Sequence, residues 1–433
     1  MNRILFGATL VVAGALSREG AAASGPERPK SCSHPSDADA VVRCALAASP
    51  EVREAQERLA ALAGRRATAA VWLPSNPTVS GNVAARRRPP PDAASVLNWG
   101  VILSQELEIA GQRGARVDAA EAESAAQARR VGVAEQEVAA GTLTAYYEAI
   151  AAQEGLRFAT DLAQTADALA AFAEGRAREA LLAGVEADVA RAEATRIGLV
   201  RFEAERRLTD SRAALAILLD VDPAGLILPA ALPAEALAPL DGGSLEEQAL
   251  RLRGELAAAE MEGKVLERRL ALVRRERIPN ITLSAFAERG EINDRILGIG
   301  LSVPIPLPDP IGRTRAGEIA ETLAQLRAAG SSTDLVRRRV RLEVARAVSA
   351  LRARRGAADL FGSDLVARAR ADLSSLREAI AARQLSLREG LVWQRSLTEL
   401  LAADIEARLG RVLARVELRR VVGLPLASRG GER

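Results

Sequence analysis

Aromatic residues, histidine and cysteine are scarce in this chain of 433 residues. Phe, Trp and Tyr together make up 3% of the sequence, and there are one histidine and two cysteines. A chain of this length could hold two or three domains, but ordinary domains bury bulky cores that these residues do not supply. Alanine, leucine, arginine and glutamate dominate instead, as in long helices and coiled coils. The composition therefore predicts long helices packed along seams.

A surplus of either charge is missing as well. The 59 basic residues are balanced by 56 acidic ones, which leaves a formal net charge of +3, and both signs are interspersed along the same segments. Such mixing is typical of solvated, salt-bridged helix surfaces and unlike a nucleic-acid patch. We therefore expect no nucleic-acid partner.

Catalytic signatures are also absent. The sequence shows no nucleophile placed with a base, no glycine-rich phosphate loop before a helix, and a single histidine. Its many glutamates and aspartates lie in segments so charged that solvated helix faces explain them. We expect neither an enzyme nor a cofactor.

The two cysteines, Cys32 and Cys44, lie near the N-terminus. An oxidising compartment allows a disulfide between them, and two unpaired thiols are the other interpretation. His34 lies between them, so a metal site completed by an aspartate is the alternative. One local cluster without a second pair of ligands is a weak signal for a metal, and we predict no metal site.

Long apolar runs are missing except at the N-terminus. Residues 4–16 are apolar, Arg3 precedes them, and three alanines follow at residues 21–23. The run is shorter than the ~20 residues of a membrane-spanning helix, whereas the pattern is typical of a secretory signal peptide. We expect residues 1–23 to be removed, residues 24–49 to form an N-terminal segment, and the protein to leave the cytoplasm.

Against this helical background, residues 297–307 alternate between apolar residues and Gly, Ser or Pro. A period of two with one apolar face predicts a β-strand. Residues 99–109 repeat the pattern, with Gln105 as the one polar intruder on the apolar face. Each segment follows another alternating segment that opens with a proline motif, at residues 76–77 and 278–280.

The two pairs of strands belong to a duplication of the chain. Each pair follows a helical segment and precedes a glycine-containing turn and a long stretch without proline. We expect two copies, a proline-rich linker between them and a polar tail. The copies are residues 50–224 and 247–425, the linker is residues 225–246, and the tail is residues 426–433. The expected strands are residues 77–87, 97–109, 280–289 and 296–307, and the expected helical hairpins are residues 112–220 and 312–421.

Apolar residues recur at steps of three and four in both hairpins, which predicts helices that pack by one face. In the first hairpin Glu154 alone interrupts this stripe, and the turn is expected around residues 175–184. In the second hairpin the turn is expected near Gln384. We interpret both stripes as core packing of coiled-coil hairpins.

The length and the faces of the strands favour a membrane. Each has about ten usable residues, enough to cross a hydrocarbon layer when tilted. A buried strand of a soluble domain is the alternative, but the faces opposite the apolar ones carry Gly, Ser, Glu and Pro. Four strands cannot close a barrel, and lipid does not tolerate open sheet edges. Two copies would give a barrel too narrow for a channel, whereas three would give twelve strands and an opening.

In the order and repetition of these pieces, the sequence resembles the TolC-like outer-membrane efflux proteins, particularly those that serve heavy-metal exporters. The pieces are the two proline motifs, the strand at residues 298–307 and the glycine-arginine turns after both second strands. The resemblance covers essentially the whole mature chain. It implies a mainly α homotrimer with a twelve-stranded β-barrel in outer-membrane lipid, carried on a long periplasmic tunnel of helical coiled coils. It also implies passive conduction of substrate from an inner-membrane efflux pump and a periplasmic adaptor protein.

The sequence departs from this family in three respects. Gly184 opens the helical turn of the first copy, but Leu385 stands at the matching place in the second, which leaves the shape of that tip open. No cysteine suits a lipid anchor. Among the few aromatic residues, Trp99 and Phe286 are the strand candidates for an interfacial girdle.

Function would then lie at the closed tip of the tunnel. Charged residues just after the hairpin turns would form rings of like charge in a trimer, which select ions or hold the gate shut. The candidates at the tip are Gly184, Glu186, Asp188, Arg388 and Glu389. A solvated helix surface explains these charges equally well.

A periplasmic adaptor or coiled-coil scaffold protein of an export system is the alternative function, since it would also combine a secretion signal with long hairpins. It predicts one hairpin flanked by split β-domains rather than two copies of strand, strand and hairpin. The substrate stays open between metal ions, which fit the resemblance best, and drugs or organic solvents.

Overall fold

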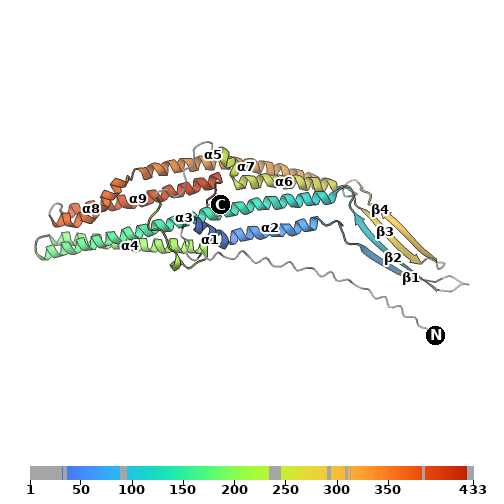
Figure 1. Cartoon of the computed structure of the whole chain (residues 1–433), viewed down its shortest axis with the longest axis horizontal. Coiled ribbons are helices and arrows are strands. Elements are labelled where there is room, and N and C mark those ends of the chain that lie inside the picture. Colours follow the sequence, from blue (N-terminus) through green and yellow to red (C-terminus); the bar gives the residue numbers. More distant parts are fainter. Residues whose placement is uncertain are drawn as a thin grey trace, which may run out of the picture.

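The computed structural model describes residues 32, 37–87, 95–233, 245–289, 294–307, 311–312, 314–382 and 386–426. The predicted signal peptide, His34, Leu385, half of the predicted linker and most of the predicted tail lie outside the described residues. The molecule is elongated, with a four-stranded sheet at one end and the turns of two helical hairpins at the other (Figure 1). The mainly helical fold with a small β part is confirmed.

The same series of elements occurs twice along the chain. The first series consists of α1 (Ala38–Ala48), α2 (Pro50–Ala69), β1 (Thr78–Arg87), β2 (Ser95–Leu107), α3 (Gln112–Arg178) and α4 (Gly184–Leu219). A short 3-10 helix, η2 (Pro223–Gly225), follows it. The second series consists of α5 (Leu245–Leu252), α6 (Gly254–Arg275), β3 (Ile281–Arg289), β4 (Arg295–Ser302), α7 (Ala316–Asp359), α8 (Ser363–Ala381) and α9 (Leu387–Val422).

Helix α3 is the longest element of the structure. Its 67 residues contain no proline, and at ~1.5 Å per residue they span about 100 Å. The helix begins after Gly111, whose positive φ of 72° suits a residue without a side chain. One continuous helix therefore connects the sheet to the far tip.

The second repeat differs from this pattern at two places. The counterpart of α3 is broken into α7 and α8 between Asp359 and Ser363, where Gly362 caps α8 with an extended backbone at φ −62° and ψ 145°. Strand β4 ends at Ser302, earlier than the expected boundary at residue 307, because Pro304 and Pro306 cannot donate to a strand ladder. The expectation of one unbroken helix before the second turn was wrong.

The sheet joins the two repeats. Its order is β1-β2-β3-β4, and every neighbouring pair is antiparallel. At its centre Leu103 of β2 pairs with Ala285 of β3, which in turn pairs with Ile299 of β4. Strands β1 and β4 are the two edges, and neither has a second neighbour among the described residues.

The helices next to the sheet pack side by side in the same order as the strands to which they connect. On the sheet side α2 packs on α3, α3 on α6, and α6 on α7; on the tip side α4 and α9 both pack on α3, and α8 packs on α9. Figure 1 shows α2 and α4 along one long edge of the molecule and α7 and α8 along the other. No described helix is long and apolar enough to cross a membrane.

The main core lies midway along the molecule, where both repeats meet. Leu143, Tyr147 and Ile150 of α3 are fully buried there, and Val412 and Val416 of α9 belong to the same cluster. A disulfide joins Cys32 to Cys44 of α1 in this cluster, with the two Cα atoms 5.4 Å apart. The disulfide and the packing of α1 on α3 attach the N-terminal segment to the core.

Candidate functional site: an apolar sheet and two helical tips

One face of the sheet is apolar across all four strands. The strand register places every second residue of each strand on this face, so that Val101 lies beside Ala287 and Ala287 beside Leu297. Leu297 and Ile299 of β4 are 82% and 84% exposed, because no part of the described chain covers this face. The exposed large side chains of this face are Val79, Val83, Leu97, Trp99, Val101, Leu103, Leu283, Leu297, Ile299 and Leu301.

The opposite face of the sheet is mostly polar or small. It carries Thr78, Ser80, Asn82, Asn98, Gly100, Ser104, Glu106, Thr282, Ser284, Glu288, Gly298, Gly300 and Ser302, with Ala84, Ile102, Ile296 and Phe286 as exceptions. The ring of Phe286 lies over Gly298, where an added Cβ would be 2.4 Å from Phe286 Cζ. Phe286 and Trp99 therefore lie on opposite faces, and the expectation that both belong to one interfacial girdle was wrong.

The base of the sheet is fastened to the helices by polar side chains. Asn280 donates from Nδ2 to Glu106 Oε1 at 2.8 Å, and Gln112 donates from Nε2 to Asn280 Oδ1 and to the carbonyl of Ile278, both at 3.1 Å. Glu108 pairs with Arg116 of α3. The asparagine of the second proline motif thus positions β3 against the first repeat, a role that the motif alone did not reveal.

The first tip is a short turn between α3 and α4. Helix α3 continues through Gly175 to Arg178, and the chain reverses in residues 179–183, so the turn is shorter than expected. Ala180 has a positive φ of 57°, and the next residue, Leu181, donates its N–H to the carbonyl of Arg176 at 2.9 Å. This bond satisfies a carbonyl at the end of α3. The left-handed backbone conformation is less favourable for alanine than for glycine.

The candidate residues of the first tip lie in the first turns of α4. Gly184 is the first residue of α4, and no atom outside its own helix lies within 4 Å of an added Cβ. Glu186 is half-buried in the first helical turn, and Asp188 is exposed. An acidic residue in the first turn is favourable because the helix dipole is positive there.

The second tip is capped differently. Ser386 accepts a hydrogen bond at Oγ from the N–H of Glu389 at 3.2 Å, and Ser386 N–H donates to Glu389 Oε2 at 2.9 Å, which forms a capping box. The backbone N–H of Ser386 and its hydroxyl, which donates to Glu389 Oε2 at 2.7 Å, lower the pKa of Glu389. Arg388 is exposed beside them. Glu389 therefore has a local role as a helix cap.

Gly390 is a tip residue that the sequence analysis missed. It is buried in the first turn of α9, and an added Cβ would lie 2.4 Å from Cδ1 and 3.1 Å from Cγ1 of Ile380 on α8. The glycine lets α8 and α9 approach closely at the second tip. The available signal was a glycine four residues after a capping serine, which fits a close helix contact.

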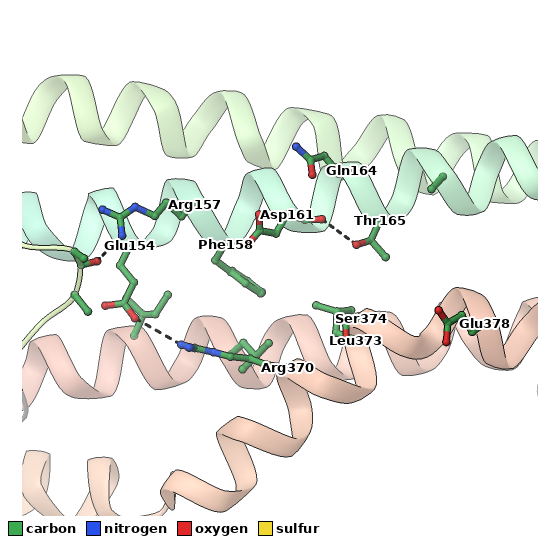
Figure 2. Close-up of a pocket in the computed structure, with 15 residues that line it drawn as sticks. Glu154, Arg157, Phe158, Asp161, Gln164, Thr165, Arg370, Leu373, Ser374 and Glu378 are labelled. Atoms are coloured by element: carbon green, nitrogen blue, oxygen red, sulfur yellow. Dashed lines mark hydrogen bonds and ion pairs between the residues drawn. The ribbon is translucent and has the colours of Figure 1, made fainter.

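Glu154 links the two repeats between the tips and the central core. Figure 2 shows Glu154 on α3 and Arg370 on α8 facing each other across a groove of about 850 Å³. Arg408 of α9 donates from Nη2 to Glu154 Oε1 at 2.6 Å and from Nη1 to Oε2 at 3.1 Å, and it also bonds Asp404 at 3.0 Å. Arg370 lies farther away, at 3.7 Å, and its side chain is 60% exposed. We call Glu154, Arg370, Asp404 and Arg408 the Glu154 cluster.

The electrostatics of the Glu154 cluster follow from burial and pairing. Burial alone would raise the pKa of Glu154, but the hydrogen bond and charge of Arg408, the N–H of Leu232 and the charge of Arg370 outweigh it and lower this pKa. The interruption that Glu154 makes in the apolar stripe thus marks a contact between repeats. The sequence did not indicate Arg408 as its partner, because the two residues are 254 positions apart.

Known proteins resemble this chain in sequence. Residues 41–220 match the family described as Outer membrane efflux protein. The chain is 28% identical to protein CyaE of Bordetella pertussis over 324 residues, which cover 72% of this chain and 68% of that protein. It is 31% identical to the cobalt-zinc-cadmium resistance protein CzcC of Cupriavidus metallidurans over 216 residues, which cover 47% of this chain and about half (49%) of that relative.

Solved structures share the fold over almost the whole length. CusC has a TM-score of 0.74 at 15% sequence identity, covering 90% of this chain and 92% of its own. The outer-membrane channel OprN has a TM-score of 0.72 at 20% identity, covering 90% of both chains. The outer membrane protein VceC of Vibrio cholerae has a TM-score of 0.70 at 17% identity, covering 90% of this chain and 96% of its own. Residues 41–220 are therefore similar in sequence to the outer membrane efflux protein family, and the chain shares the fold of these solved outer-membrane proteins over almost its whole length.

Proposed function

We propose that this protein is the outer-membrane channel of a tripartite efflux system, and not an enzyme. It would passively conduct substrate to the outside from an inner-membrane pump and a periplasmic adaptor protein. The observation that carries the proposal is the continuous, exposed apolar face of the four-stranded sheet, backed by a mostly polar face. Lipid on one side and water on the other is the setting that suits such a sheet.

The open edges of the sheet support a homotrimer. Lipid does not tolerate the unpaired backbone groups of β1 and β4, so other copies must pair with them. The two edges lie on opposite sides of the molecule, together with α2 and α4 on one side and α7 and α8 on the other (Figure 1). Joining one side to the other repeats head to tail and closes a ring, and three copies supply about twelve strands, enough to leave an opening.

The proposed substrate is metal ions. This rests on the likeness to CzcC, which is named a cobalt-zinc-cadmium resistance protein. Among the described residues no group of three or more His, Cys, Asp and Glu side chains could hold a metal ion. The metal is therefore proposed as a conducted substrate.

The proposed gate is the pair of hairpin tips at the end far from the sheet. In a trimer, Glu186, Asp188 and Arg388 would each repeat around the axis and form rings of charge. Glu389 is the weaker candidate, because its carboxylate already caps α9. Gly184 is a candidate by its position at the first tip only, because an added Cβ there would meet no atom within 4 Å.

The adaptor alternative is less well supported. It predicts one hairpin between two halves of a β-domain, whereas the described residues contain two hairpins and a sheet to which both repeats contribute. No observation on the described part of the chain favours the adaptor over the channel.

Membrane fractionation followed by native mass spectrometry in detergent tests the proposal. We expect the chain in the outer-membrane fraction as a trimer that conducts ions across a planar lipid bilayer. A soluble monomer in the periplasm would contradict the channel and leave a scaffold as the better account.

A further inference from the structure

We infer that Gln394 weakens the buried contact between α8 and α9, so that these two helices separate when the second tip opens. We call this contact the α8–α9 seam. The inference rests on the proposed gate and adds the residue and the helix contact at which the second tip opens. The evidence is a buried amide without a partner, its place in an apolar seam, and the weak attachment of α8 to other helices.

The side chain of Gln394 is buried but makes no hydrogen bond. It is 1% exposed, and neither Oε1 nor Nε2 has a partner among the described residues. Gln127, another buried glutamine, donates from Nε2 to the carbonyl of Ala55 at 3.0 Å. An unpaired buried amide costs free energy, because it gives up its hydrogen bonds to water and gains none in return. Gln394 therefore destabilises the packed state of the second tip.

Gln394 occupies a position in the α8–α9 seam. Leu387, Gly390 and Gln394 are buried on α9 at steps of three and four residues, which places them on one side of the helix. Gly390 lies against Ile380 of α8. Because the two helices of a hairpin run antiparallel, Gln394, one turn further along α9, lies at the level of Leu376, one turn back along α8. Leu376 is buried in the hydrophobic cluster of the tips.

A polar residue in a helical seam can instead fix the register of the two helices, as a buried asparagine does in coiled coils. For this it needs a polar group opposite with which to pair. Leu376 offers no such group in its side chain, and the amide of Gln394 has no other partner in the described part of the chain. Fixing the register therefore does not explain Gln394, whereas weakening the seam does.

Helix α8 is the segment that this weakening releases. It is separated from α7 by the break before Ser363, and it packs mainly on α9. Its ion pair to α3, between Arg370 and Glu154, is long at 3.7 Å, and the side chain of Arg370 is 60% exposed. Figure 1 shows α8 and α9 at the end of the molecule far from the sheet. A change of backbone conformation at the break moves α8 away from α9 without unfolding α7.

Separation of α8 from α9 exposes the amide of Gln394 to water. The amide is unpaired in the closed seam, whereas water pairs with it in the open seam. The residue thus reduces the free-energy difference between the closed and the open seam. An apolar residue of similar size at position 394 would remove this effect and favour the closed seam.

Hydrogen–deuterium exchange of the full chain in detergent tests the seam. Gln394→Met keeps an unbranched side chain without the amide, and Gln394→Leu is a second apolar variant in case methionine packs poorly. We expect exchange in residues 363–381 to slow about tenfold in both, the change that ~1.4 kcal/mol of added stability produces. The matched control is Gln164→Met, which changes an exposed glutamine of α3 and should leave these rates as they are.

Channel opening tests the link to the gate. Wild type and Gln394→Met are compared in planar lipid bilayers, and the variant should open about tenfold less often. Exchange or opening that is as fast as in wild type, or faster, in both Gln394 variants would overturn the inference and leave the channel intact. A wild-type protein that conducts no ions would overturn the proposed channel, whereas the exchange rates would still decide whether Gln394 weakens the seam.

Discussion

Single residues connect the two repeats at the Glu154 cluster. Glu154 is 12% exposed and accepts two hydrogen bonds from Arg408, so its carboxylate has little access to water. A charge this buried is tolerated only when it is paired, since an unpaired one would keep its desolvation cost. The contact fixes α9 on α3, whereas Arg370 of α8 adds only a longer, exposed ion pair.

Replacing Glu154 should weaken the contact between the two repeats and destabilise the protein. Glu154→Gln keeps the shape but removes the charge that Arg408 faces, and we expect a loss of roughly 1–3 kcal/mol of stability. The control Arg370→Ala removes an exposed partner and should cost about 1 kcal/mol or less. The urea midpoint of helical signal in detergent measures both, and equal effects would contradict the assigned difference.

The effect should depend on pH in one direction. Because the pKa of Glu154 is lower in the folded protein than in an unfolded chain, its charged form stabilises the fold above the unfolded pKa of ~4.3. This contribution is lost as pH falls through the lower, folded pKa. The difference between wild type and Glu154→Gln should therefore be full at pH 7 and shrink below about pH 4.

At the scale of elements, the two hairpins end in different ways. The first tip uses a left-handed Ala180 and no side-chain cap on α4, whereas the second uses a capping box on α9 and a close contact at Gly390. The second hairpin also contains the break before α8. The repeats share an order of elements but not the details of their tips.

The two tip glycines should therefore respond differently to alanine. Gly390→Ala would force Ile380 of the tip core to move, and overpacking of this kind costs roughly 1–3 kcal/mol, partly offset by better helix propensity. Gly184→Ala has open space around it and should be neutral. Hydrogen–deuterium exchange in residues 386–400 should speed up for Gly390→Ala alone. Equal exchange in both variants would show that α8 and α9 are not closely packed there.

At the scale of the whole molecule, two ends with different surfaces are held apart by a rod. The sheet presents its apolar face at one end, and the charged tips lie at the other (Figure 1). Helix α3 runs the distance between them as one piece. The apolar surface across four strands is far larger than the patch that a single exposed leucine makes. A surface of this size is typical of a site that contacts a membrane or another protein.

Neighbouring residues of β3 allow a matched test of the two faces. Ala285 lies on the apolar face between Leu103 and Ile299, and Ser284 lies on the other face between Ser104 and Gly300. Ala285→Arg should cost about 2–4 kcal/mol if that face meets lipid, whereas Ser284→Arg should cost little. The measurement is the fraction of chain that resists urea extraction from outer membranes. Equal loss for both variants would contradict a lipid-facing surface.

Much of this architecture could be read from the sequence, because its causes are local. Alternation of apolar residues decides which face of a strand is apolar, and long stretches without proline decide where helices continue. Both patterns occur twice, so the repeated order of two strands followed by a helical hairpin could be predicted from the sequence. The break before α8 was missed because the apolar stripe continues on both sides, although Gly362 followed by Ser363 and Asp364 is a helix-start signal.

The tertiary structure decided what depends on distant partners. Nothing local to Glu154 indicates Arg408, and nothing local to Asn280 indicates Glu106 or Gln112, because each contact depends on how long helices and strands align. The register of β2 on β3 likewise joins residues of different repeats. The sequence by itself determined the elements and their faces through periodicity, whereas the fold determined their alignment, because contacts between repeats depend on the packing of the whole array.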